Sequence, residues 1–191
     1  MSASVSCITG DTTTMHSRLQ EVLAHVLTFE DSLKGASLLV KLLASNSQFD
    51  DARFNCFDIL KHLGETFPPE INASTVQNEL PAIRSMLTNV SYEQMKALPQ
   101  MTGEFCPYAE CRIWSILSNT LPWITDRSKL NAMTFLNLLC MCSNMSKPLL
   151  LPILSSRMLK LTLQHGLCAD GIVGLALAGH SMVRVLSPCC S

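Results

Sequence analysis

Apolar residues recur at every third or fourth position along most of this 191-residue chain, and no segment alternates long enough to form a strand. A repeat near 3.6 residues places apolar side chains on one face of a helix, whereas a strand needs a repeat of two. The clearest examples predict helices over about 29–44 and 48–63. The pattern therefore predicts an all-α fold of about eight helices joined by short loops, arranged as stacked helical hairpins or an irregular bundle.

Glycine and proline set the expected ends of the early helices. Gly64 can adopt the backbone conformation that ends a helix, so it should cap the helix over 48–63. Pro81 cannot donate a backbone hydrogen bond inside a helix. We therefore predict that the next helix begins near Glu79 rather than at Ser74.

Similar signals predict the later helices. They are expected between Ser91 and Pro99, from Pro107 to about Asn119, from Asp126 or Ser128 to about Ser143, from Pro148 to His165, and from Asp170 to about 186. The helix that ends near Ser143 is apolar on nearly all sides and should be the most buried. Asp170 should cap the last helix, where Gly171 and Gly174 permit close approach by another helix.

The composition favours a protein partner. Hydrophobic residues make up 48% of the chain and charged residues only 15%, against about 25% in an average protein. Some apolar surface is therefore expected to await a neighbour. The formal net charge is −1, and Lys and Arg are scattered singly. Nucleic-acid binding needs a clustered basic face, so we predict no nucleic-acid partner.

Residues 1–13 are polar and aperiodic and predict a disordered tail, while 14–191 predict one helical repeat-like domain. The chain does not begin with a secretory signal, so a cytoplasmic protein is expected. Nine cysteines, an odd number placed mostly in apolar stripes, should be free and buried. They are Cys7, Cys56, Cys106, Cys111, Cys140, Cys142, Cys168, Cys189 and Cys190.

The last predicted helix, 171–186, is the best candidate for a membrane span, but it is too short and contains His180 and Arg184. We therefore predict no membrane span. Its apolar residues are spread around the helix axis, and residues 187–191 predict no partner helix for them. An exposed apolar patch and self-association through 171–186 are expected.

Three segments carry a family resemblance. FNCFDILKHLGETFPPEI at 54–71 resembles the second helix of a tetratricopeptide-like unit. YEQMKALPQMTG at 92–103 resembles a recurring short-helix step, and RMLKLTLQHGLCADGIVGLALAGHSMV at 157–183 resembles a turn into a small-residue helix. In this order, the three resemble the helical region of large multidomain signalling ATPases. In such proteins an AAA-type ATPase precedes tetratricopeptide-like helices, and a histidine kinase or cyclase often follows.

The resemblance covers about residues 15–186 and implies a non-catalytic scaffold in a cytosolic signalling protein. Such a scaffold packs against the rest of its parent or displays a groove to a partner domain. It also implies a fragment, because the chain ends at LSPCCS directly after one helix. We assign no catalytic, cofactor-binding or metal-binding residue. The chain has no Gly-Lys dipeptide and hence no GxxxxGK[ST] phosphate loop, so we predict no ATP hydrolysis.

Two other functions remain open. One is a small enzyme that uses Cys168 and His165, because a thiolate is favoured near the start of a helix. Simple packing of both residues is the favoured interpretation, since no orienting group or oxyanion site is indicated nearby. The other is a membrane-associated helical protein that uses 130–186.

The paired cysteines do not predict a zinc site. Structural zinc prefers two pairs of ligands with two to five residues inside each pair. Cys140 and Cys142 point about 200° apart on a helix. A proline and a helix turn separate Cys106 from Cys111, and Cys189–Cys190 is terminal.

The apolar stripes also predict the core. Seven residues should be buried: Leu23, Leu39, Leu60, Trp114, Leu136, Leu139 and Leu163. Seven methionines should fill irregular helix interfaces, with a methionine-rich binding groove as the alternative. They are Met86, Met95, Met101, Met133, Met141, Met145 and Met158.

Overall fold

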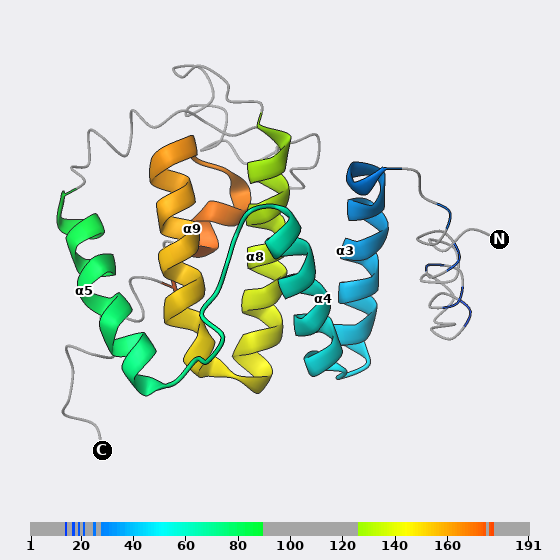
Figure 1. The fold of residues 1–191 in the computed structure, drawn as a ribbon, viewed down its shortest axis with the longest axis horizontal. Helices are drawn as coiled ribbons and strands as arrows, with labels where there is room; N and C mark the ends of the chain where they lie inside the picture. Colours follow the sequence, from blue (N-terminus) through cyan, green and yellow to red (C-terminus); the bar gives the residue numbers. More distant parts are fainter. Residues whose placement is uncertain are drawn as a thin grey trace.

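The computed structural model describes residues 14, 17, 19, 21, 25, 28–89, 126–174, 176 and 177. Within these residues the elements are helices, with no strand, which confirms the predicted all-α class. They are α3 (Phe29–Ser45), α4 (Phe49–His62), α5 (Ala73–Asn89), α8 (Arg127–Ser146), the short 3-10 helix η1 (Pro148–Leu150) and α9 (Leu151–His165), shown in Figure 1. A further helical segment begins at Ala169.

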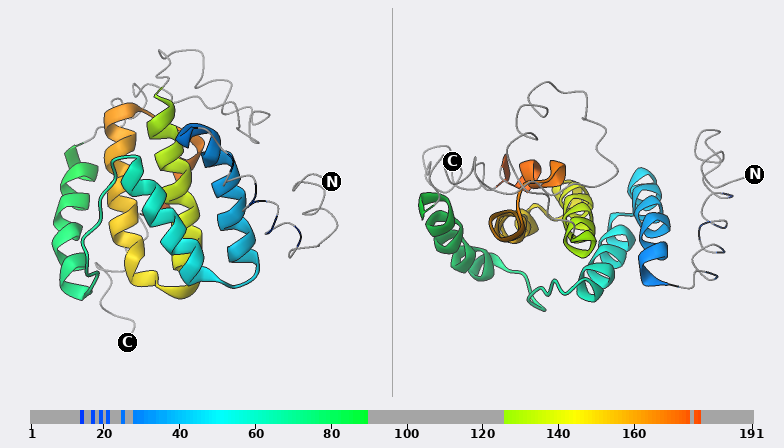
Figure 2. Two further views of the ribbon diagram at one scale, coloured as in Figure 1. Left: turned by 45° about the vertical axis from the view of Figure 1, so that its right-hand side comes forward. Right: turned by 90° about the horizontal axis from the view of Figure 1, so that it is seen from above.

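The helices lie side by side in the order α5, α9, α8, α4 and α3 (Figures 1 and 2). Short connections make antiparallel hairpins of α3 with α4 and of α8 with α9. The spatial order differs from the order in the sequence, because α5 packs against α9 and not against α4. The connection over 63–72 makes this possible by crossing the face of α8 and α9.

Polar contacts at both ends hold α4 antiparallel to α8. Arg53, near the start of α4, donates to the hydroxyl of Ser146 at the end of α8. At the opposite end, Nζ of Lys129 lies 3.2 Å from Oε1 of Glu65, just after α4. Since α4 is also antiparallel to α3, the helices α3 and α8 run in the same direction on either side of it (Figure 1).

The core of the described residues lies between α3, α4, α8 and α9. Leu39, Leu60, Leu136 and Leu139 are buried, whereas Leu163 is only partly buried beside α5. Among the described helices, α8 contributes the largest set of buried side chains, in agreement with its expected burial. They include Met133, Phe135, Leu136, Leu139 and Cys142.

The end of α4 is formed as the sequence predicts. Gly64 has a φ of 86°, and its N–H donates to the carbonyl of Lys61 while the N–H of Glu65 donates to Leu60. These two bonds satisfy carbonyls that the helix leaves without partners. The end of α3 has the same pattern at Ser47, which adopts a φ of 61° without being glycine.

The prediction that Pro81 marks a helix start is wrong, because α5 begins at Ala73 and continues through Pro81. Asn72 caps the helix, and its Oδ1 accepts a hydrogen bond from the N–H of Thr75 over 2.9 Å. Pro81 removes the backbone donor to the carbonyl of Gln77. Both residues are exposed, so water can satisfy that carbonyl.

The expected helix from Pro148 to His165 is divided into η1 and α9, with Pro152 in the first turn of α9. Several other predictions lie outside the described residues. They are the tail over 1–13, the helices over 91–99 and 107–119, the burial of Leu23 and Trp114, the positions of Met95 and Met101, and the five cysteines Cys7, Cys106, Cys111, Cys189 and Cys190. Of the apolar patch predicted over 171–186, residues 175 and 178–186 also lie outside them.

Candidate functional site

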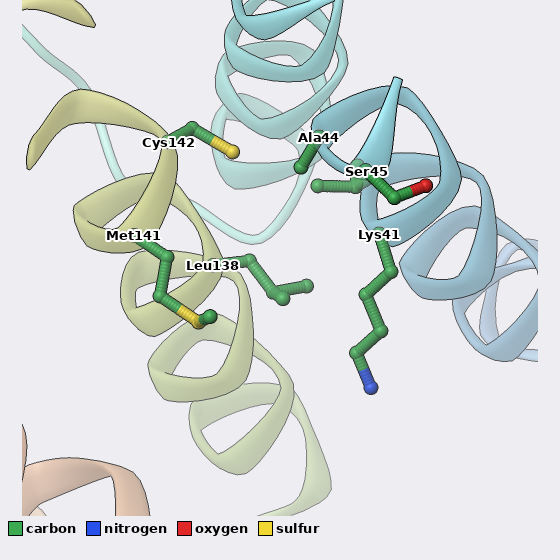
Figure 3. A pocket seen from close by; sticks show the side chains of 7 residues that line it. Lys41, Ala44, Ser45, Leu138, Met141 and Cys142 are labelled. Carbon is green, nitrogen blue, oxygen red and sulfur yellow. The ribbon is translucent and has the colours of Figure 1, made fainter. Parts of the chain in front are cut away.

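A groove of about 250 Å³ lies between the parallel helices α3 and α8 (Figure 3). Its lining is almost entirely apolar and consists of Val40, Lys41, Ala44, Ser45, Leu138, Met141 and Cys142. Val40, Leu138 and Cys142 are buried and form the floor. The groove exists because α3 and α8 both pack closely on α4 but contact each other less extensively.

The rim of the groove combines an apolar side with a cationic side. The side chain of Met141 on α8 is 63% exposed and faces the gap. Lys41 is exposed on the opposite rim, on α3 (Figure 3). The hydroxyl of Ser45 donates to the carbonyl of Leu42 over 2.7 Å, so it is already bonded within its own helix. Lys41 is therefore the one charged group of the lining.

The prediction that the methionines fill helix interfaces holds for Met133 and Met158, which are fully buried, but is wrong for Met141 and Met145. Met145 is 69% exposed one turn after Met141. The sequence contained a signal for this difference. Thr134, Asn137 and Asn144 form a polar stripe at helical spacing along α8, and Met141 occupies a position within that stripe.

Cys168 lies next to the start of a helix, as the enzyme alternative requires, but its contacts there are structural. Its Sγ accepts a hydrogen bond from the N–H of Gly171 over 3.3 Å, which is the position of a helix cap. Burial raises the pKa of the Cys168 thiol to about 11, so the thiol stays protonated near neutral pH. No hydrogen bond joins Cys168 to His165. These features do not supply an activated nucleophile.

Asp170, which the sequence predicts as the cap of this helix, has a different role. Its carboxylate accepts hydrogen bonds from Oγ1 of Thr134 over 2.9 Å and from Nδ2 of Asn137 over 2.7 Å. The cap prediction is wrong because the helix begins one residue before Asp170, with Cys168 at the capping position. Asp170 instead attaches the helix to the middle of α8.

Three more thiols lie in the core at the contact between α4 and α8. Cys56, Cys140 and Cys142 are free and buried, as the sequence predicts. Burial raises the pKa of the Cys140 thiol to about 12 and also raises the pKa of Cys56. Raised thiol pKa values oppose the thiolate form that zinc requires. Within the described ranges, no three His, Cys, Asp or Glu side chains form a set that could hold a metal ion.

The small residues after Cys168 pack as expected. A methyl group built on Gly174 would lie 2.4 Å from Cβ of Met158, so α9 approaches this helix too closely for any side chain there. Ile172 points outward and is 52% exposed. Val173 and Leu177 are half-buried against the core.

Among the described helices, none has the length and apolar character needed to cross a membrane. Comparisons with known protein families, with curated proteins and with solved structures gave no match for this chain.

Proposed function

We propose that this chain is a non-catalytic helical scaffold that binds another protein through the groove between α3 and α8. The observation that carries the proposal is the exposure of Met141 directly beside the buried apolar floor of that groove. An exposed apolar side chain next to an apolar hollow is a favourable site for burial by a partner. Because the groove contains one charged group and no acid–base pair, its chemistry suits binding.

The architecture supports a scaffold of the tetratricopeptide-like kind. The pairs α3–α4 and α8–α9 are antiparallel hairpins packed side by side, which is the unit of such scaffolds. The position of α5 against α9 departs from simple sequential stacking. The parent of this segment would be a multidomain cytoplasmic signalling protein, as the resemblance of 54–71 and 157–183 implies.

The burial of Cys168, which raises the pKa of its thiol, supports the scaffold over a thiol enzyme. The sulfur of Cys168 accepts a hydrogen bond from the backbone of its own helix, and no hydrogen bond joins it to His165. We therefore still expect that the purified chain hydrolyses no ATP and carries out no thiol chemistry.

A photo-crosslinking amino acid placed at Met141 tests the proposal in cells that express the protein. The matched control is the same crosslinker at Phe54, which is 75% exposed on α4 and does not line the groove. We expect a discrete protein adduct at position 141 that is absent at position 54. The purified partner should then bind Met141→Asp at least about tenfold more weakly than the native chain, with unchanged thermal unfolding.

Two outcomes would contradict the scaffold proposal. One is the same set of adducts at positions 141 and 54, which would mean that the groove has no special role. The other is an enzymatic turnover that follows the protein through purification and is lost in Cys168→Ala.

A further inference from the structure

The groove between α3 and α8 also restricts which kind of segment can bind. Extended peptides bind to an exposed sheet edge, and proline-rich peptides bind to a groove lined by aromatic rings. The described residues form no strand, and no aromatic residue lines the groove. Among the modes that bury apolar side chains of a peptide, the remaining one is a helix laid against a hydrophobic groove, anchored by side chains at helical spacing.

The geometry of the two walls suits a helix. The helices α3 and α8 run in the same direction, and the lining residues occupy corresponding turns, 40–45 on one and 138–142 on the other. A third helix can place an apolar ridge into the depression between two parallel helices. The floor offers Leu138 and Val40, and the flexible side chain of Met141 lies beside Leu138 on the same helix.

The positive charge on the rim of the groove favours an acidic residue on the flank of the bound helix. Lys41 extends beside the groove and has no ion-pair partner among the described residues. No residue of the lining is acidic. A carboxylate on the flank of a bound helix would meet the ammonium of Lys41, whereas a lysine there would meet a like charge.

We propose that the α3–α8 groove binds an amphipathic helix of a partner protein, which inserts an apolar side chain between the two walls, against Val40 and Leu138, and places a Glu or Asp against Lys41. This inference rests on the proposed scaffold function and specifies its partner. The groove is small, so a single anchor and one ion pair predict a weak, reversible interaction.

A displayed library of 18-residue helices tests the proposal with the full chain as bait. Each member carries apolar residues at positions i, i+3, i+4 and i+7, with Glu or Lys present equally at the flanking positions. Selections are run in parallel on the native chain and on Lys41→Glu, Met141→Asp and Lys34→Glu. Lys34 is a matched control, because it is exposed two turns before Lys41 on the same helix and does not line the groove.

We expect the native chain and Lys34→Glu to enrich helices with Glu at one flanking position. Lys41→Glu should enrich Lys at that position, and Met141→Asp should recover none of these helices. Peptides synthesised with Glu or Lys at the selected position should differ about two- to fivefold in affinity for the native chain, the range of a solvent-exposed ion pair. The preference should reverse on Lys41→Glu.

Each contrary result has a distinct meaning. Helices that need Met141 but show no preference between Glu and Lys would overturn the acidic partner and leave the scaffold proposal standing. Helices that bind Met141→Asp as well as the native chain would overturn the groove as the helix site. A selection that yields no binder overturns the helical partner, while crosslinking at Met141 decides the scaffold proposal independently.

Discussion

The side-chain amide of Asn137 donates a 2.7 Å hydrogen bond to the carboxylate of Asp170 and so joins the middle of α8 to the helix that begins at Ala169. The hydroxyl of Thr134 donates to the other oxygen of the same carboxylate. One acidic side chain therefore satisfies two polar groups on neighbouring turns of α8. This contact anchors a helix whose outer side chain, Ile172, is 52% exposed.

Replacing Asp170 by Ala removes the acceptor shared by Thr134 and Asn137. Two partly buried polar groups then lose their partner, so we expect the free energy of unfolding to fall by about 1–3 kcal/mol. Urea unfolding followed by circular dichroism measures the change. Asp58→Ala is the control, because Asp58 is exposed on α4 and should cost less than about 0.5 kcal/mol. Equal effects of the two variants would contradict the anchoring role of Asp170.

Truncation of Leu139 tests the core. Leu139 is completely buried on α8, so Leu139→Ala should lower the free energy of unfolding by about 2–5 kcal/mol through lost burial and a residual cavity. Met145→Ala removes a side chain of similar size from the exposed face of the same helix and should change stability far less. The two variants are compared by urea unfolding. A small effect at Leu139 would mean that α8 is packed by a different face.

Much of the fold follows from the sequence because the apolar stripes report directly which face of a helix is buried. The boundaries of α4 and the burial of Leu39, Leu60 and Leu139 were predictable in this way. The course of α5 was not predictable in this way. Pro81 leaves the carbonyl of Gln77 without a backbone donor, and the energetic cost of that loss depends on whether the carbonyl faces water. The exposure of that carbonyl depends on the tertiary structure and does not appear in the local sequence pattern.

The groove was predictable only in outline. A methionine-rich surface was one of two alternatives, and the polar stripe along α8 favoured exposure of Met141. The opposite wall was not foreseeable, because α3 lies far from α8 in the sequence and the two helices are brought together mainly by their shared packing on α4. The capping role of Cys168 was also missed, since sulfur is a rare acceptor at that position.

Pro81 should limit the stability of α5. Pro81→Ala restores the backbone donor to the carbonyl of Gln77 in an exposed part of the helix, where no packing is lost. Because proline is about 3 kcal/mol less favourable than alanine within a helix, we expect a stability gain of up to this amount. Thermal and urea unfolding should both show it. A neutral or destabilising result would indicate that the helix is interrupted at this position.

Gly174 should tolerate no side chain. The methyl group of Gly174→Ala would lie 2.4 Å from Cβ of Met158, an atom fixed to the backbone of α9, so one helix must move. We expect a loss of about 1–3 kcal/mol in the free energy of unfolding. Gly171→Ala is the comparison, because its nearest contacts include the flexible end of Met133 and the hydroxyl of Thr162. A larger loss at Gly171 than at Gly174 would contradict this packing.

The buried thiol of Cys168 should make stability fall at alkaline pH. Its pKa is raised by burial from 9.0 to about 11, so below pH 9 the thiol is protonated in both the folded and the unfolded chain. Between pH 9 and 11 the unfolded chain releases this proton and the folded chain retains it. The free energy of unfolding should therefore decrease by about 1.4 kcal/mol per pH unit from this group, and no further above pH 11.

Comparison with Cys168→Ala isolates that contribution, because all other titrating groups are common to both chains. The variant also lacks the sulfur that accepts from Gly171, which lowers its stability by an amount that does not change with pH. We expect the stability difference between the native chain and the variant to shrink steadily from pH 9 to pH 11 in urea unfolding. Parallel curves over this range would show that the thiol is hydrated in the folded protein, and the helix beginning at Ala169 would then not be held against α8 and α9 as described.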